Sequence, residues 1–352
     1  MTLMNISSPH VTSDGDAGSM MRLVLFATLP GLAMLTYWYG WGRLIHVGWA
    51  VLLALGFETI ALLMRGRPVG FYLKDYSAVL TGVLLGLALP PLAPWWITLV
   101  GVAFAIIIAK HFFGGLGYNP FNPAMVGYVV LLISFPVQMT SWVAPRDLVE
   151  GQPALLSFVE TFAHIFPVMA QTPVDGYTMA TALDLFKQHQ GSLADQAVNV
   201  RAAFGAFGAA GSEWVNLGYL VGGLFLLYKR VFTWHAPVGM LGALLLMSLL
   251  FHSALGIESV ASPLFHWFSG ATMLGAFFII TDPVTSATSL KGRLIYGFSI
   301  GSLIFIIRSW GNYPDAVAFS VLLMNFAAPF LDYYTQPRSF GQAAIYARKQ
   351  KD

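Results

Sequence analysis

Ten apolar segments, each long enough to form a membrane-spanning helix, constrain the fold of this chain more than any other feature. A spanning helix needs about 20 mainly apolar residues. The 352 residues include only 18 basic and 16 acidic side chains, less than half the charged fraction of an ordinary soluble protein. We therefore expect an all-α polytopic membrane protein. The segments are residues 21–40, 44–64, 76–92, 94–113, 122–138, 213–232, 236–255, 262–281, 293–310 and 315–334.

The placement of Lys and Arg predicts the orientation, because short cytoplasmic loops of membrane proteins are enriched in basic residues. With the N-terminus inside, 13 of the 18 basic residues lie on the cytoplasmic side. Three of the other five, Arg146, Lys187 and Arg201, lie in one long outer loop to which the rule does not extend. Both termini are therefore expected in the cytoplasm. The first 20 residues lack a basic n-region, so we expect no cleavable signal peptide.

The long outer loop divides the spans into two groups of five. An odd number per half makes the halves inverted copies if they are related, as in many transporters. A weak internal echo supports this, since Thr-Gly at 81–82 and Ser-Gly at 269–270 lie in the third span of each half. The loop contains two apolar stretches, 155–168 and 202–210, that could form interfacial or reentrant helices. The predicted regions are a cytoplasmic segment 1–20, a first half 21–138, an outer loop 139–212, a second half 213–334 and a cytoplasmic tail 335–352.

The absence of cysteine excludes disulfides, thiolate metal sites and iron–sulfur ligation by this chain. The chain also lacks the glycine-rich fingerprint of a dinucleotide-binding fold. Its net charge of +2 is too balanced for a nucleic-acid-binding protein. Any nicotinamide or cluster chemistry is therefore expected in partner subunits, and we expect no metal site here.

A stretch rich in glycine and asparagine, residues 112–124, connects the fourth and fifth spans on the inner side. Its glycines allow the backbone to approach a ligand closely. Asn119 and Asn122 lie three residues apart, so both amides could present donors and acceptors to one site. The edge of an isoalloxazine or pterin ring offers a matching mixture. In the alternative interpretation this stretch is a helix connector whose asparagines cap helix ends.

Two further polar stretches interrupt the apolar pattern. Residues 281–289 place Asp282 at the inner end of the eighth span, where a carboxylate is costly unless it is paired or hydrated. Asp282 is therefore a functional candidate, or else part of a helix-end turn near Lys291 or Arg293. Residues 175–183, in the outer loop, begin with an Asp-Gly turn. Taken locally, they predict only a helix with an ordinary N-terminal cap.

The outer-loop stretch resembles the recognition motif for covalent flavinylation, Asp-Gly-x-Ser/Thr-Gly-Ala-Ser/Thr. Together with residues 112–124, residues 281–285 and the ten-span layout, it makes residues 21–338 similar to the RnfD/NqrB family of membrane subunits. The resemblance implies that a periplasmic flavin transferase joins the phosphate of FMN to Thr181. Recognition would then depend on four preceding residues, Asp175, Gly176, Thr178 and Ala180.

Met179 departs from the motif, which usually has glycine two residues before the acceptor. Residues 269–272, with the sequence Ser-Gly-Ala-Thr, match the core of the motif better, but they lie inside an apolar span. A soluble transferase could not reach Thr272 there, and no Asp-Gly pair precedes it. Accessibility therefore favours Thr181 as the acceptor.

The resemblance also implies a function. The chain would be a subunit of an Rnf-type complex in a bacterial inner membrane, carrying electrons through covalent FMN between reduced ferredoxin and NAD. Coupled movement of Na⁺ or H⁺ would make the complex an ion-translocating oxidoreductase. Asn119 and Asn122 match positions that contact a second, non-covalent flavin, riboflavin, in the sodium-pumping relative, and Asp282 or Thr285 would lie on the ion or flavin path. Implied partners are the other subunits, including a second FMN-bearing subunit and iron–sulfur subunits.

Two other functions stay open at this stage. A flavin-free secondary transporter or channel is one, because inverted halves and broken helices suit a permease equally well. A structural scaffold subunit whose motif is never modified is the other. Only the outer-loop motif and the 112–124 stretch separate these functions from electron transfer.

Overall fold

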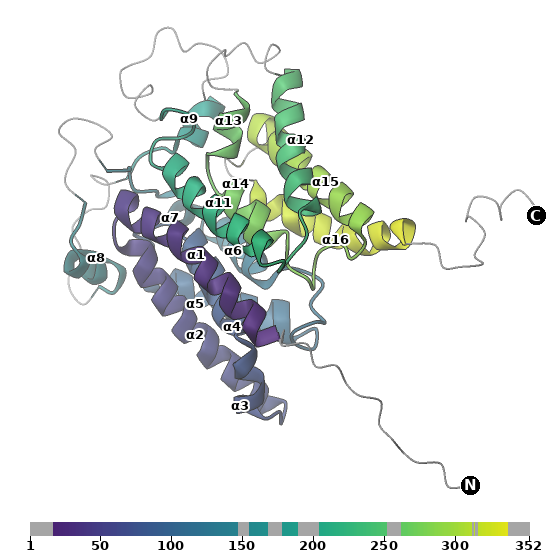
Figure 1. Ribbon diagram of the computed structural model, residues 1–352. Coiled ribbons are helices and arrows are strands. Elements are labelled where there is room, and N and C mark those ends of the chain that lie inside the picture. The colour runs from purple at the N-terminus through teal and green to yellow at the C-terminus, as the bar shows by residue number, and fades with distance from the viewer. Residues whose placement is uncertain are drawn as a thin grey trace, which may run out of the picture.

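The computed structural model describes residues 17–146, 155–167, 178–188, 204–251, 262–311, 313 and 316–336. Within these residues the chain is predominantly helical (Figure 1), and its only extended pairings are two isolated bridges. The predicted helical class is therefore confirmed.

Helices occur in all ten predicted segments. The first half holds α1 (Ala17–Tyr39), α2 (Gly42–Met64), α3 (Val69–Tyr72), η1 (Leu73–Asp75), α4 (Ser77–Ala88), α5 (Trp95–Ala103), the π-helical η2 (Phe104–His111), α6 (Pro123–Ser134) and α7 (Pro136–Thr140). The outer loop contributes α8 (Phe158–Ile165) and α9 (Ala182–Gln188). The second half holds α11 (Ser212–Tyr228), α12 (His235–Phe251), α13 (Pro263–Trp267), α14 (Thr272–Leu274), the π-helical η4 (Gly275–Ile279), α15 (Leu290–Trp310) and α16 (Val317–Thr335).

Four of the described helices, α1, α2, α15 and α16, are long and apolar enough to cross a membrane. The helices α4, α6, α12 and the continuous α5–η2 are apolar but shorter. The helix α4 ends early because Pro90, Pro91 and Pro94 follow it, and three prolines so close together remove too many amide donors for the helix to continue. These lengths fit a multi-pass membrane protein. Ten complete spans stay a prediction.

The two halves meet where α1 packs against α11 (Figure 1) and α6 against α16. Gly218 and Gly222 of α11 lie directly on the α1 backbone, and a Cβ at Gly222 would be 2.0 Å from the carbonyl oxygen of Ala27. Small residues permit such close approach between helices in membranes. On α1, Gly31 leaves room for the ring of Tyr219, which an added Cβ would approach to 2.3 Å. This packing fixes Tyr219 at the interface between the halves.

The predicted eighth span is broken in the middle. The helix α13 ends at Trp267, and the chain turns through residues 268–271 before α14, with a φ of +61° at Gly270. Arg308 bonds the carbonyl groups at this break, because its Nη1 and Nη2 donate to the carbonyl oxygens of His266 and Ser269 at 2.9 and 3.3 Å. Irregular backbone at membrane depth requires such satisfied polar groups.

The first half buries a network of charged groups between α2 and η2. Lys110 Nζ donates to both carboxylate oxygens of Glu58, at 2.8 and 2.9 Å, and to the hydroxyl oxygen of Ser77 at 2.8 Å. His111 Nε2 lies 3.0 Å from Glu58 Oε2, and His111 Nδ1 lies 3.3 Å from Arg65 Nη1. Buried charges are costly unless each is compensated. The network therefore ties α2 to η2.

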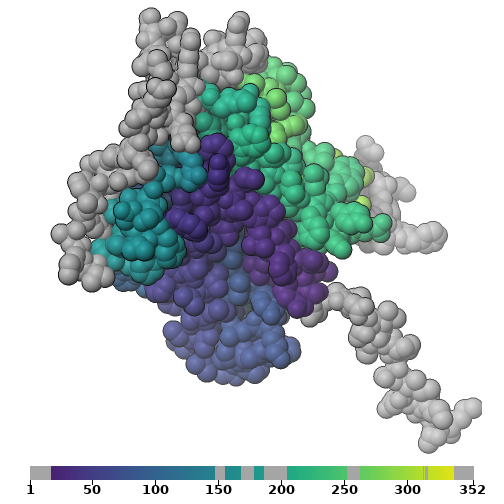
Figure 2. Space-filling view, turned by 60° about the vertical axis from the view of Figure 1, so that its left-hand side comes forward, coloured from purple at the N-terminus to yellow at the C-terminus, as the bar shows by residue number. Residues whose placement is uncertain are grey.

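The helix α8 lies apart from the other helices (Figure 1) and contacts α2 on the flank of the first half, where Figure 2 shows it in teal. A capping box starts it, since the Glu160 amide donates to Ser157 Oγ and the Ser157 amide donates to Glu160 Oε2. The hydrogen bond from the Ser157 amide lowers the pKa of the Glu160 carboxyl. An exposed apolar face is typical of a helix in the membrane interface. The exposed apolar residues of α8 are Phe158, Val159 and Phe162.

The stretch 155–168 is thus helical over part of its described length, as the sequence predicts for an interfacial helix. The stretch 202–210 differs from the expectation of a second helix. It is described from Phe204 onward and forms a tight turn, closed by an antiparallel bridge between Phe204 and Ala209. The carboxylate of Glu213 holds this turn, because Glu213 Oε2 accepts from the amides of Phe207 and Gly208 at 3.0 and 3.1 Å.

Candidate functional site

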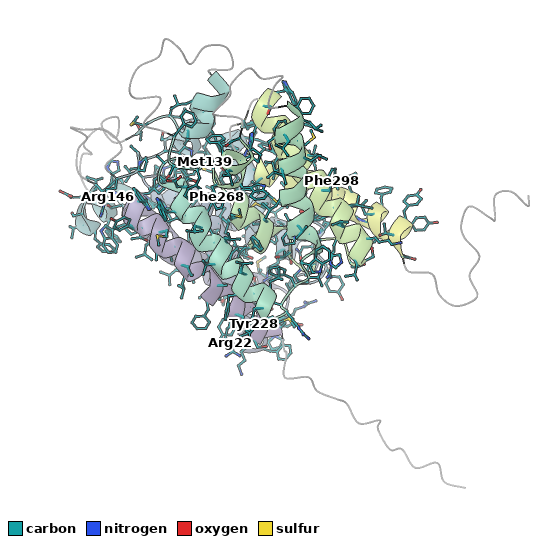
Figure 3. All side chains as sticks on the ribbon, turned by 45° about the horizontal axis from the view of Figure 1, so that its top comes forward. Arg22, Met139, Arg146, Tyr228, Phe268 and Phe298 are labelled. Carbon is teal, nitrogen blue, oxygen red and sulfur yellow. The ribbon has the colours of Figure 1, made fainter. Side chains whose placement is uncertain are left out.

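A cavity of about 180 Å³ lies between the two halves, beside the outer-loop segment that contains Thr181. Its walls come from α1, α2, α4, α6, α7, α9, α11, η4 and α16, and from the chain around 142–145, 179–181, 209–210 and 270–274. In Figure 3, Met139 of the wall and Arg146 lie toward the end of the molecule opposite to Arg22 and Tyr228. The predicted orientation puts that end outside, so we call this space the outer cavity.

The segment before Thr181 is held against the residues that follow α7. Thr178 pairs with Val143 in an antiparallel bridge, and the Met179 amide donates to the carbonyl oxygen of Trp142 at 2.9 Å. These bonds hold the end of the predicted motif against the outer cavity. The motif residues on the cavity wall are Met179, Ala180 and Thr181.

Thr181 caps the N-terminus of α9. Its Oγ1 accepts from the Asp184 amide at 3.2 Å and donates to Asp184 Oδ2 at 2.6 Å, and the Thr181 amide donates to the same oxygen at 2.9 Å. The local interpretation of this stretch as a helix cap is confirmed. Thr181 is half-buried, and Asp175 and Gly176 lie outside the described residues.

Two polar side chains in the outer cavity lack a complete set of partners. Arg43 Nη1 donates to the carbonyl oxygen of Leu87 at 3.2 Å, and the guanidinium carbon lies 5.6 and 4.9 Å from the ring centroids of Tyr39 and Trp142. Within the described residues, Arg43 Nε and Tyr219 Oη are buried with no hydrogen-bond partner. Neither residue is among the sequence-predicted site residues. A basic residue directly before an apolar segment was the available signal for Arg43, whereas no pattern singles out Tyr219.

Thr272, the competing acceptor, is fully buried, with 0% of its surface exposed. Its Oγ1 lies 2.9 Å from the carbonyl oxygens of both His266 and Ser269, and it accepts from Arg308 Nη2 at 3.0 Å. The hydroxyl group of Thr272 is therefore surrounded by partners inside the second half.

The two other predicted stretches meet through Asn325 of α16, which sequence analysis does not identify. The backbone N–H of Asn122 donates to Asn325 Oδ1 at 3.3 Å, and Asn325 Nδ2 donates to the backbone carbonyl oxygen of Thr285 at 2.9 Å. Thr285 Oγ1 in turn donates to Asp282 Oδ2 at 2.8 Å. Three of the predicted site residues, Asn122, Asp282 and Thr285, thus lie on one chain of hydrogen bonds.

The capping alternative is confirmed for Asn122, whose Oδ1 accepts from the Met125 amide at the start of α6 at 3.3 Å. Asn119 is buried, and its Nδ2 donates to the carbonyl oxygen of Phe121 at 3.1 Å. Within the described chain, Asn119 Oδ1 is a buried acceptor with no donor. Neither asparagine lines the outer cavity.

Asp282 forms a helix-end turn, as the alternative interpretation predicts, because its Oδ1 accepts from the Val284 amide at 3.2 Å. Arg293, one of the two nearby cations, does not form an ion pair with Asp282. Arg293 donates instead to the carbonyl oxygen of Ala287 at 3.1 Å and to Thr233 Oγ1 at 3.0 Å.

Comparison with known proteins adds a family relationship. The model of the NQR2, RnfD, RnfE family matches residues 4–341. The chain is 56% identical over 341 residues to the D subunit of the ion-translocating oxidoreductase complex of Ectopseudomonas mendocina, covering 97% of this chain and 96% of that protein. It is 53% identical over 345 residues to the protein of the same name from Cellvibrio japonicus, covering 97% and 96%. The protein of that name from Vibrio vulnificus is 49% identical over 356 residues, covering 97% and 100%.

Proposed function

Because this chain belongs to the NQR2, RnfD, RnfE family, we propose that it carries electrons through an FMN bonded covalently to Thr181, as a membrane subunit of an Rnf-type complex. The complex would exchange electrons between reduced ferredoxin and NAD and couple them to movement of Na⁺ or H⁺. Nicotinamide and iron–sulfur chemistry would take place in partner subunits, among them a second FMN-bearing subunit. Bound FMN supplies the capacity to accept and release electrons.

One observation carries the proposal: Thr181 lies on the wall of a cavity between the halves and is half-buried. The residues of the cavity fit a flavin. Trp142, Tyr39 and the apolar side chains of the walls would contact its ring, and Arg43 Nε and Tyr219 Oη have hydrogen bonds to give. Thr272 has no exposed surface through which a transferase could reach it.

Attachment of FMN would be a transfer of its phosphoryl group from FAD to the Thr181 hydroxyl. The donor is FAD, used by a periplasmic transferase with Mg²⁺. The Thr181 Oγ forms a bond to the phosphorus of the FMN half, the diphosphate bond of FAD breaks, and AMP leaves. Asp184 Oδ2, which already accepts the hydroxyl proton at 2.6 Å, takes that proton.

A second, non-covalent flavin, riboflavin, is proposed beside Asn119 and Asn122. The buried Asn119 Oδ1 that lacks a donor among the described residues supports this assignment, since a flavin ring carries an N–H group. The hydrogen bonds that join Asn122 to Thr285 and Asp282 through Asn325 support placing these residues on the ion or flavin path.

We further propose ten spans in a bacterial inner membrane, with both termini in the cytoplasm and the halves related as inverted repeats. Contacts between α1 and α11, and between α6 and α16, support the repeat, because they join the first span to the first and the fifth to the fifth. A two-fold axis in the membrane plane produces such pairings.

The experiment is in-gel fluorescence of the full chain after denaturation in SDS, from cells that contain the flavin transferase. We expect a flavin band in the wild type and in Thr181→Ser, and none in Thr181→Val. Thr140→Val is the matched control, because Thr140 lies on the same cavity wall and its hydroxyl donates to the Pro136 carbonyl oxygen of its own helix. Mass spectrometry that finds no adduct on the wild type would favour a flavin-free transporter or a scaffold.

A further inference from the structure

Arg43 is a charged group whose partners do not compensate its charge. It stands at the start of α2, a helix long enough to span the membrane, where an ionisable side chain is costly and usually functional. The ion pairs within the described residues join Glu58 to Lys110 and His111, and none includes Arg43. Among the described residues the guanidinium makes one hydrogen bond, to the Leu87 carbonyl oxygen, and it lies over two aromatic rings.

Tyr219 is the second polar group that faces the outer cavity. It is 3% exposed, and its Oη has no partner within the part of the chain that the structure describes. Its ring cannot turn elsewhere, because Gly31 of α1 lies against it and the Phe278 ring centroid is 5.8 Å away. A buried donor without an acceptor destabilises the fold, so such a group is expected to meet an acceptor in the working protein.

The depth of Tyr219 indicates which part of a ligand it meets. Tyr219 lies seven residues beyond the start of α11, or about 10 Å along the helix axis. A phosphate bonded to Thr181 must stay at the N-terminus of α9. Thr181 and Tyr219 line the same cavity, so a flavin attached at Thr181 through its phosphate would extend its ring toward Tyr219.

We infer that Arg43 and Tyr219 bind the pyrimidine edge of the flavin ring and favour its reduced, anionic form, an inference that rests on the proposed attachment to Thr181. The step would be a one-electron transfer that oxidises a reduced donor in the complex and reduces the ring, and no covalent bond would form or break. The Arg43 guanidinium would compensate the negative charge that one-electron reduction puts on N1 and the C2 carbonyl, so no proton would need to follow. Charge near N1 is a recognised means of tuning a flavin, and the apolar cavity walls strengthen the interaction.

The test measures the reduction potential of the covalent flavin. The full chain, loaded by the transferase and purified in detergent, is titrated with dithionite while its absorbance is followed. We expect Arg43→Gln to weaken the preference for the reduced form about tenfold, equivalent to a potential about 59 mV lower for a one-electron couple. The potential of Arg43→Gln should also begin to vary with pH, since a proton replaces the lost cation. Arg43→Lys should retain most of the wild-type potential, and Tyr219→Phe should lower it by less than Arg43→Gln.

Arg146→Gln is the matched control. It removes the same charge near the same end of the molecule, but Arg146 lies over the ring of Tyr37, 4.7 Å from its centroid, and does not line the outer cavity. Equal potentials in the wild type, Arg43→Gln and Arg146→Gln, with normal loading in all three, would overturn the inference. If Arg43→Gln does not fold, an unchanged potential in Tyr219→Phe overturns it. A wild type without a fluorescent band would instead refute the proposed function.

Discussion

The Thr181 oxygen that caps α9 is the same atom to which FMN would be bonded. Since its proton is donated to Asp184 Oδ2 at 2.6 Å, this carboxylate is placed to act as the base in attachment. We expect Asp184→Asn to slow loading about 100-fold, a usual contribution of a general base, because an amide still accepts a hydrogen bond but takes no proton. The time course of in-gel fluorescence with transferase, FAD and Mg²⁺ measures the rate. Asp184→Glu should restore much of it, and equal rates for the wild type and Asp184→Asn would contradict the assignment.

Glu58 and Lys110 are 3% and 2% exposed and depend on each other for compensation of charge. Glu58→Gln leaves the Lys110 ammonium buried without a carboxylate, so we expect a loss of about 3–5 kcal/mol in the free energy of unfolding. Lys110→Met should cost a similar amount, and the double variant should cost less than the sum of the two. Thermal unfolding in detergent gives the values for this double-mutant cycle. Strictly additive costs would show that the two groups are not coupled.

The role of a single residue can be predicted from the sequence when that role depends on near neighbours along the chain. Thr181 belongs to a contiguous motif, and Asn122 stands directly before a helix it caps, so both are visible in the sequence. Tyr219 is not visible, and the sequence shows Arg43 only as a basic residue before an apolar segment, because their role depends on two helices from different halves meeting at one cavity. Asn325 escapes prediction for the same reason, since its partners Asn122 and Thr285 are distant in sequence.

Among the contacts between helices, the one between α1 and α11 requires glycine at particular positions. Gly222→Ala would place a Cβ 2.0 Å from the Ala27 carbonyl oxygen, and the two helices would have to separate. We expect a loss of about 1–3 kcal/mol in the free energy of unfolding, the usual cost of overpacking. Gly242→Ala on α12 is the control, because its Cβ would meet nothing within 4 Å. A thermal unfolding midpoint in Gly222→Ala as high as in Gly242→Ala would contradict the close packing.

The helix break inside the eighth apolar segment is a feature that hydropathy does not predict. Residues 262–281 are mainly apolar and carry no Asp, Glu, Lys or Arg, which favours a continuous helix, but the chain leaves the helix at 268–271. The break is stable because Arg308, on another helix, bonds the carbonyl groups that it exposes. Hydropathy measures the transfer of side chains into lipid, and it contains no information about distant donors for the backbone.

For the whole molecule, the proposed orientation decides whether the proposed electron path has to cross the membrane. In the proposed function ferredoxin and NAD react on the cytoplasmic side, so a flavin at the proposed outer site would require electrons to cross the membrane. The separation of Met139 and Arg146 from Arg22 and Tyr228 in Figure 3 fits an outer end that contains the cavity and an inner end that is rich in basic residues.

The chain has no cysteine, so single cysteines can report this orientation against an empty background. Ala180 is exposed beside Thr181, and Tyr118 is 74% exposed in the loop between η2 and α6. In intact spheroplasts that lack the transferase, we expect a membrane-impermeant maleimide to label Ala180→Cys but not Tyr118→Cys. Inside-out vesicles should give the reverse result, because the reagent then meets the cytoplasmic face. Labelling of Tyr118→Cys in intact spheroplasts would place Thr181 in the cytoplasm, where no periplasmic transferase could modify it.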